Sequence, residues 1–248
     1  MHLAILIFLT IFIEIASSSD TKAPKALNLE TTAFKIFSNY DSGIKEAPFL
    51  YDTFYPIGYS SDKIAYIIEY DTDPADIVHI ETIIQDLVTD KIIWHDDFRK
   101  EDDITNVTFK SFWEERHTKI LEKLREHDMQ IDNSLQLYQE KLYYKHDALF
   151  ISSKSKKIHK KDWGSILFLR NSTIYLRSEK KGQKIIDQKS YNGEYFLDRK
   201  PIGYIPLGAR GSKRVAVVVA KLHRGWEGPP HNIGYAIVGA NLAVGFKR

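Results

Sequence analysis

Residues 54–94, FYPIGYSSDKIAYIIEYDTDPADIVHIETIIQDLVTDKIIW, form the stretch on which the predicted fold depends. Its Pro-Ile-Gly-Tyr tetrapeptide at residues 56–59 recurs at residues 201–204, and a turn and a β-branched run follow each copy. The two runs are KIAYII at residues 63–68 and RVAVVV at residues 214–219. Because such runs between turn residues are typical of strands, we predict two related β-hairpin halves in this chain.

Residues 104–128, between these halves, change to the apolar spacing of a helix. Charged side chains such as Glu114, Glu122 and Lys123 separate the apolar ones, which gives one apolar and one polar face. We therefore predict one central amphipathic helix, with a core-facing stripe formed by Phe109, Phe112, Trp113, Ile120, Leu121 and Leu124.

The predicted fold class is α+β and predominantly antiparallel β, with this helix between the two halves. The N-terminal β half covers residues 20–103, the C-terminal β half covers residues 129–248, and residues 30–248 are expected to form one compact domain. Residues 134–144 fit either a helix or a strand. Further strands are predicted at residues 32–37, 80–87, 91–94, 148–152, 165–177, 184–188, 233–238 and 242–246.

The first residues have the pattern of an export signal. Residues 3–13 are apolar over about the length of a signal-peptide core, and small residues at 16–19 suit cleavage. The apolar run is shorter than the ~20 residues that a membrane-spanning helix needs, and no later apolar run is long enough. We predict a signal peptide at residues 1–19 and an exported mature protein, periplasmic or extracellular, that does not span the membrane.

The composition excludes several kinds of chemistry. The chain has no cysteine, which excludes disulfides, thiolate metal ligands and a cysteine nucleophile. A formal net charge of +2 over 248 residues is too small to indicate a nucleic-acid partner. The glycine-rich nucleotide loops and the serine-hydrolase and helical zinc motifs are absent from the sequence, so no cofactor is predicted.

The small net charge hides two segments of opposite charge. Residues 62–103 carry thirteen acidic and four basic residues, whereas residues 141–189 carry thirteen basic and four acidic ones. Either the two segments face each other, or the basic segment meets an anionic partner such as a phospholipid head group or a wall polymer. The candidate contacts on the basic side are Lys156, Lys157, Lys160 and Lys161.

The loop HRGWEGPPH at residues 223–231 holds the most suggestive group of polar side chains. His223, Glu227 and His231 are candidate zinc ligands, since imidazole and carboxylate groups both bind zinc. A plain connecting loop is the competing interpretation, because the glycines and prolines exclude the helix that usually fixes paired ligands. Trp226 and Glu227 are alternatively candidate contacts for a partner, as loop aromatics often meet sugars or other chains.

A second polar group contains alternate acidic residues before a histidine. Its start resembles that of a calcium-binding loop, but the proline at position 74 and the missing glycine depart from that pattern. A solvent-exposed hairpin tip is therefore the favoured interpretation of Asp71, Asp73, Asp76, His79 and Glu81.

Two resemblances add to this picture. Residues 59–66 (YSSDKIAY) and 84–91 (IQDLVTDK) resemble a blade fragment of the TolB-type β-propellers. The Pro-Ile-Gly and IQDLVTDK blocks, with a glycine-punctuated C-terminal segment at residues 203–246, are similar to those of uncharacterised exported bacterial proteins. The resemblances imply a β-rich exported protein and bring no activity with them.

The sequence favours a non-enzymatic exported protein that binds a partner through Trp226 and the basic hairpins. The expected partner is an anionic component of the cell envelope or another protein. The alternative is a hydrolase acting on envelope polymers, either metal-assisted or based on carboxylates.

Overall fold

The computed structural model of this chain describes most of the sequence beyond the predicted signal peptide. Two α-helices lie in the described part, and neither is long and apolar enough to cross a bilayer. The predicted signal peptide, Trp226 and Glu227 lie outside the described residues. Those residues are 22–38, 40, 49–71, 77–101, 108–161, 166–193, 195–208, 212–225 and 229–247.

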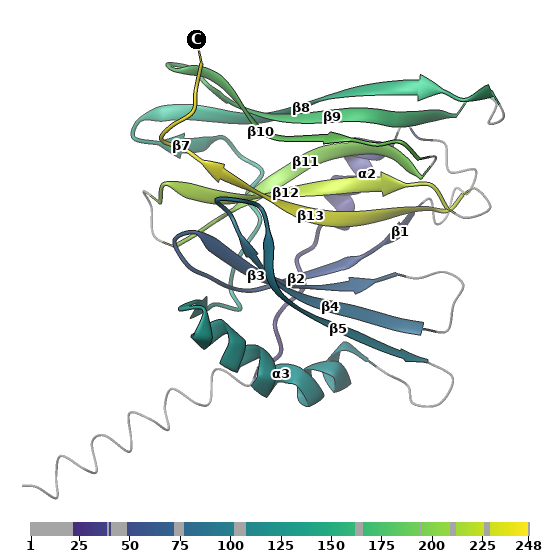
Figure 1. Cartoon of the computed structure of the whole chain (residues 1–248), viewed down its shortest axis with the longest axis vertical. Helices are drawn as coiled ribbons and strands as arrows, with labels where there is room; N and C mark the ends of the chain where they lie inside the picture. Colours follow the sequence, from purple (N-terminus) through teal and green to yellow (C-terminus); the bar gives the residue numbers. More distant parts are fainter. Residues whose placement is uncertain are drawn as a thin grey trace, which may run out of the picture.

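A four-stranded central sheet lies in the middle of the molecule (Figure 1). Its strand order is β1 (Phe49–Tyr51), β13 (His231–Asn241), β12 (Arg214–His223) and β11 (Phe196–Pro206), and only the β1–β13 pair is parallel. Side chains alternate along β12, so both of its faces are buried in apolar clusters. Burial on both faces explains why the sequence of β12 is a continuous apolar run.

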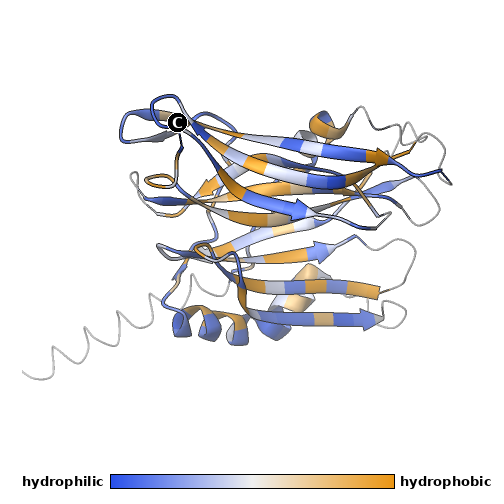
Figure 2. Ribbon diagram, turned by 45° about the horizontal axis from the view of Figure 1, so that its top comes forward, coloured by the Kyte–Doolittle hydropathy of each residue, from blue (hydrophilic) through white to orange (hydrophobic). Residues whose placement is uncertain are grey.

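A lower sheet packs against one face of the central sheet (Figure 1). Its antiparallel strands run in the order β5 (Ile92–Glu101), β4 (Ile77–Asp86), β3 (Lys63–Tyr70), β2 (Thr53–Tyr59) and β6 (Gln130–Ile131). The two predicted hairpins at the start of the chain are confirmed by these strands. Hydrophilic and hydrophobic residues alternate along the outermost strand, next to the long helix (Figure 2).

Helix α3 (Phe109–Glu126) covers the other face of the lower sheet (Figure 1). It begins with a capping box, in which the Thr108 side chain accepts from the Ser111 N–H and the Ser111 side chain accepts from the Thr108 N–H. The predicted amphipathic helix is confirmed, although it begins at Phe109 rather than at residue 104. Its buried residues are Phe112, Trp113, Ile120, Leu121 and Leu124.

An upper sheet packs on the remaining face of the central sheet (Figure 1). Its antiparallel strands run in the order β10 (Gly182–Ser190), β9 (Leu167–Ser178), β8 (Asp147–His159) and β7 (Leu142–Tyr144). The molecule is therefore layered as helix, lower sheet, central sheet and upper sheet. This arrangement confirms the predicted α+β class with predominantly antiparallel strands.

A second helix, α2 (Glu30–Phe37), stands where the sequence predicted a strand at residues 32–37. The strand prediction was wrong because it rested on the alternation of apolar residues. The four-residue spacing of Ala33 and Phe37, which is typical of a helix, is the pattern that the structure follows. A strand would place Lys35 on the same face as Ala33 and Phe37, whereas the helix buries Ala33 and Phe37 and leaves Lys35 exposed. Both buried residues join the core between the central and lower sheets.

The two Pro-Ile-Gly-Tyr segments share a local geometry. A β-bulge interrupts the ladder between Pro56 and Gly58 in β2, and another lies between Pro201 and Gly203 in β11. A Cβ on Gly58 would lie 2.7 Å from the Gln130 carbonyl oxygen, and one on Gly203 would lie 2.7 Å from the Tyr138 carbonyl oxygen. The chain between residues 130 and 138 thus contacts both segments, and glycine is needed at each contact.

One open alternative is decided and one expectation is corrected. Residues 134–144, which fit either a helix or a strand, form no helix; they contain an isolated bridge from Tyr138 to Tyr204 and the short strand β7. Residues 242–246 form no strand, because the chain bends after Leu242 and Gly245 takes a φ of 87°. Beyond that turn, Lys247 pairs with Gln183 at the edge of the upper sheet.

Candidate functional site

The outer face of the upper sheet carries Lys154, Lys156 and Arg177 at positions that the strand register sets on one side. Leu149, Ile174 and Leu176 point into the core that the upper sheet shares with the central sheet. Because strand side chains alternate, the residues between them point outward. On β8, β9 and β10 these outward residues are Phe150, Ser152, Lys154, Lys156, Asn171, Thr173, Tyr175, Arg177, Gln183, Ile185 and Gln188.

This outer face is positively charged and has no acidic member among the outward residues just named. Among the described residues, no ion pair forms with the cationic groups of Lys154, Lys156 or Arg177. Arg177 lies directly across from Phe150, and Tyr175 lies across from both Ser152 and Ile185. Cations therefore alternate with aromatic, apolar and hydroxyl side chains over neighbouring strands.

The same face is hollowed at one end. A cavity of about 790 Å³ is lined by Tyr175, Arg177, Gln183 and Ile185, together with Lys247 of the C-terminal segment. Lys247 reaches this position because its backbone pairs with that of Gln183. The C-terminal segment thus lines one side of this cavity, next to the basic outer face of the upper sheet.

The four predicted lysines have different surroundings. Lys156 is exposed on the outer face, whereas Lys157, the next residue of β8, points inward because strand side chains alternate. The Lys157 Nζ donates to Asp198 Oδ2 at 2.9 Å and lies over the Tyr40 ring, so this lysine is occupied within the fold. Lys160 and Lys161 follow the end of β8, the first half-buried and the second exposed.

The acidic and basic segments do not face each other, because the central sheet separates the lower from the upper sheet (Figure 1). Acidic residues of the lower sheet instead pair with helix α3, as when Asp96 binds Lys119. In the same interface Glu115 binds Lys100 at 2.7 Å. The charge asymmetry of the sequence therefore becomes a difference between two sides of the molecule.

The histidines of the predicted zinc site lie on adjacent strands but on different faces. The register pairs His223 with Asn232, which sets His231 on the opposite face of the central sheet. His231 Nδ1 accepts a hydrogen bond from the Gly225 N–H at 3.3 Å. Burial, together with the charge of Lys221, lowers the pKa of His223 to about 3. Within the described residues the two imidazoles do not converge on one ion.

A half-buried polar cluster that sequence reasoning missed surrounds Gly234. A Cβ there would lie 2.8 Å from Asp52 Oδ2, 3.5 Å from His223 Nε2 and 3.6 Å from Lys221 Cε. Burial raises the pKa of Asp52 to about 7, and burial lowers the pKa of Lys221. A lysine inside the apolar run of β12 is the sequence signal that could have revealed this cluster.

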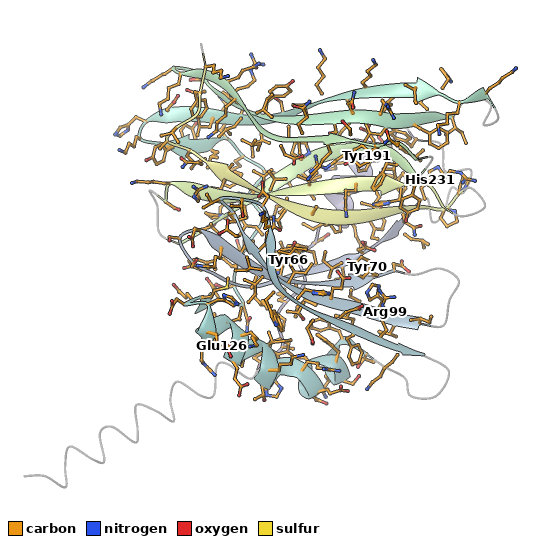
Figure 3. The ribbon with its side chains drawn as sticks, in the orientation of Figure 1. Tyr66, Tyr70, Arg99, Glu126, Tyr191 and His231 are labelled. Carbon is orange, nitrogen blue, oxygen red and sulfur yellow. The ribbon has the colours of Figure 1, made fainter. Side chains whose placement is uncertain are left out.

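A second polar cluster lies on the lower sheet and contains part of the predicted acidic group. His79 Nε2 lies 3.0 Å from Asp97 Oδ1 and 3.5 Å from Glu81 Oε1. The Tyr70 ring stacks on the His79 ring with centroids 4.4 Å apart. Tyr70 and Arg99 lie toward the same end of the lower sheet (Figure 3). Asp73 and Asp76 lie outside the described residues.

Comparisons of the chain with protein-family models, curated proteins and solved structures find no match. The function is therefore argued from the surfaces and clusters above.

Proposed function

We propose that this protein is an exported, non-enzymatic binding protein that holds an anionic polymer of the cell envelope on the outer face of its upper sheet. The observation that carries this proposal is that Lys154, Lys156 and Arg177 share one face and form no ion pair within the described residues. Glu179, at the turn after β9, is an acidic residue that lines a hollow beside Arg177 and Phe150. Lys154 and Lys156 are two residues apart on one strand, which separates them by about 7 Å along the sheet. Arg177 extends the positive field toward the hollow.

The remaining side chains on this face suit a sugar-containing polymer. The half-buried Tyr175 offers a ring that can pack against sugar rings, whereas Lys141 Nζ already lies over the Phe150 ring, 5.0 Å from its centroid. Gln183, Asn171 and Thr173 offer both donors and acceptors of hydrogen bonds. A sheet face with a hollow at one end can hold an extended chain along its strands and one sugar unit in the hollow.

A binding experiment with fluorescein-labelled heparin, a sulfated polysaccharide, tests this proposal. The triple variant Lys154→Gln, Lys156→Gln, Arg177→Gln should bind the probe about tenfold more weakly, since each exposed charge contact contributes up to ~1 kcal/mol. Its affinity should also depend less steeply on salt. Fluorescence anisotropy at several salt concentrations measures both effects.

The matched control removes the same charge from the opposite side of the molecule. Lys110→Gln, Lys123→Gln, Arg125→Gln changes three cations of helix α3 and should leave the affinity within about twofold, because those groups lie beyond the screening length from the upper sheet. Equal losses in the two triple variants would show that net charge alone drives binding, and the proposed surface would then be wrong.

A hydrolase acting on the same polymers is the second candidate function. The cluster of Asp52, Lys221 and His223 favours it, because strongly shifted pKa values concentrate at catalytic sites. Incubating purified envelope polysaccharide with the protein and measuring chain length by size-exclusion chromatography decides between the candidates. Shortening that is lost in Asp52→Asn would support the hydrolase over simple binding.

A further inference from the structure

Glu81 and Asp97 form an unusual pair in the lower sheet. They lie directly opposite each other in the β4–β5 ladder, where two like charges repel. A cation between the two carboxylates would remove the repulsion.

His79 places a nitrogen beside both carboxylates. The three side chains can each offer one ligand atom, and these atoms all lie within 4.8 Å of one another. The Nε2 atom is shielded from solvent and makes no aligned hydrogen bond, although Asp97 Oδ1 is only 3.0 Å away. An aligned donor at that distance would count as a hydrogen bond, so the geometry leaves the nitrogen available to an ion.

The spacing of these atoms matches the ligand shell of a small ion. Ligands about 2.0 to 2.1 Å from a tetrahedral zinc ion are about 3.3 Å apart. The two contacts of His79 Nε2, 3.0 Å to Asp97 Oδ1 and 3.5 Å to Glu81 Oε1, lie on either side of that value. Small side-chain movements would therefore complete the geometry.

Tyr70 holds two of the three side chains in place. Its ring stacks on His79, and its hydroxyl donates to Glu81 Oε2 at 2.8 Å, which leaves Oε1 directed at His79. Partners of this kind orient the ligands of metal sites in proteins. Asp97 is 37% exposed, so solvent can reach the ion and fill a fourth position.

We propose that His79, Glu81 and Asp97 form a binding site for a divalent transition-metal ion, with zinc as the reference ion. The site is separate from the outer face of the upper sheet and does not depend on polymer binding. It also differs from the zinc site predicted in the loop at residues 223–231.

Isothermal titration calorimetry, in which zinc chloride is added to the metal-free mature protein, tests the proposal. The expected result is one zinc ion per chain at this site and a loss of affinity of about 100-fold in His79→Ala, because one of three protein ligands is removed. His95→Ala is the matched control: it removes an exposed imidazole from the same strand as Asp97 and should leave the affinity unchanged. Circular dichroism confirms that each variant is folded.

Two neighbouring substitutions distinguish a metal site from a simple ion pair. Arg99 Nε donates to Asp97 Oδ1 at 3.2 Å and so competes with the ion for that oxygen. Arg99→Gln should tighten zinc binding about fivefold, because the free energy of one exposed ion pair is of that size. Tyr70→Phe should weaken it about tenfold through the loss of an orienting partner.

The proposal is overturned if the wild-type protein takes up no zinc, or if His79→Ala binds zinc as tightly as wild type. It is also overturned if zinc binding disappears in His223→Ala while His79→Ala retains it, since the ion would then occupy the loop.

Discussion

Replacing Gly239 by alanine is expected to destabilise the fold by about 3 kcal/mol, at the upper end of the cost of overpacking a core. Gly239 lies on β13, where the β4–β5 turn of the lower sheet meets the central sheet. A Cβ at this position would lie 2.7 Å from the carbonyl carbon of Leu87 and 2.8 Å from its Cα. These are backbone atoms, so the clash cannot be relieved by rotating a side chain.

The same contact includes a hydrogen bond that the substitution would strain. The Gly239 N–H donates to Asp90 Oδ1 at 2.7 Å, and the Arg214 side chain donates to the Leu87 carbonyl oxygen at 3.2 Å. Separating the layers to admit a methyl group would lengthen both bonds, and each contributes about 1 kcal/mol.

Urea unfolding followed by tryptophan fluorescence measures the effect. Gly193→Ala is the control, because among the described residues a Cβ there would have one neighbour within 4.0 Å, the Tyr195 backbone nitrogen. We expect that control to change stability by less than about 0.5 kcal/mol. Equal stability of the two variants would contradict the close approach of the Leu87 backbone to β13.

Replacing Asp52 by asparagine is expected to stabilise the protein at pH 8 by about 2 to 4 kcal/mol and to have little effect at pH 4. Burial raises the pKa of Asp52 from its ordinary 3.8 to about 7 in the folded protein. The folded state thus favours the neutral acid. Ionisation costs stability as the pH rises from about 4 to about 7, and the full penalty remains above that range. Asparagine stays neutral and can still accept the Asp71 N–H bond.

Thermal unfolding of the two proteins at intervals between pH 4 and pH 8 measures this difference. Asp86→Asn is the control, for which the expected change in stability has the opposite sign. The Thr89 N–H, with further hydrogen bonds from the same turn, lowers the pKa of Asp86. Its carboxylate stabilises the fold above its ordinary pKa, and that stability is lost as the pH falls. Asp86→Asn should therefore be less stable at pH 8. A destabilised Asp52→Asn at pH 8 would mean that Asp52 is ionised and held by Lys221.

Local periodicity accounts for the parts of the fold that the sequence could predict. The helical spacing around Phe112 and Leu124 and the apolar runs of β3 and β12 each carry their own signal over several residues. Helix α2 was missed because eight residues are too short for one period to dominate. The stacking of the three sheets depends on which sheet faces pack together. These contacts join residues far apart in the sequence, so a local sequence pattern does not predict them.

Residue spacing in the sequence could have predicted one of the two polar clusters but not the other. Glu81 and Asp97 are equally far from Thr89 in the predicted turn, so a symmetric hairpin would have placed them opposite each other. The group of Asp52, Lys221 and His223 could not be found in this way. It depends on the parallel pairing of β1 with β13, two segments from nearly opposite ends of the described chain.

That parallel pairing also constrains when the chain can finish folding. Phe49 can meet His231 only after the residues between them have been synthesised, and contacts between such distant residues form slowly. A polypeptide emerging from the ribosome would lack its central sheet until β11, β12 and β13 were made, with the apolar surfaces of earlier strands uncovered. We expect the nascent chain to remain a substrate for chaperones until β13 has been synthesised, and amides of β12 to exchange with deuterium most slowly once it has folded.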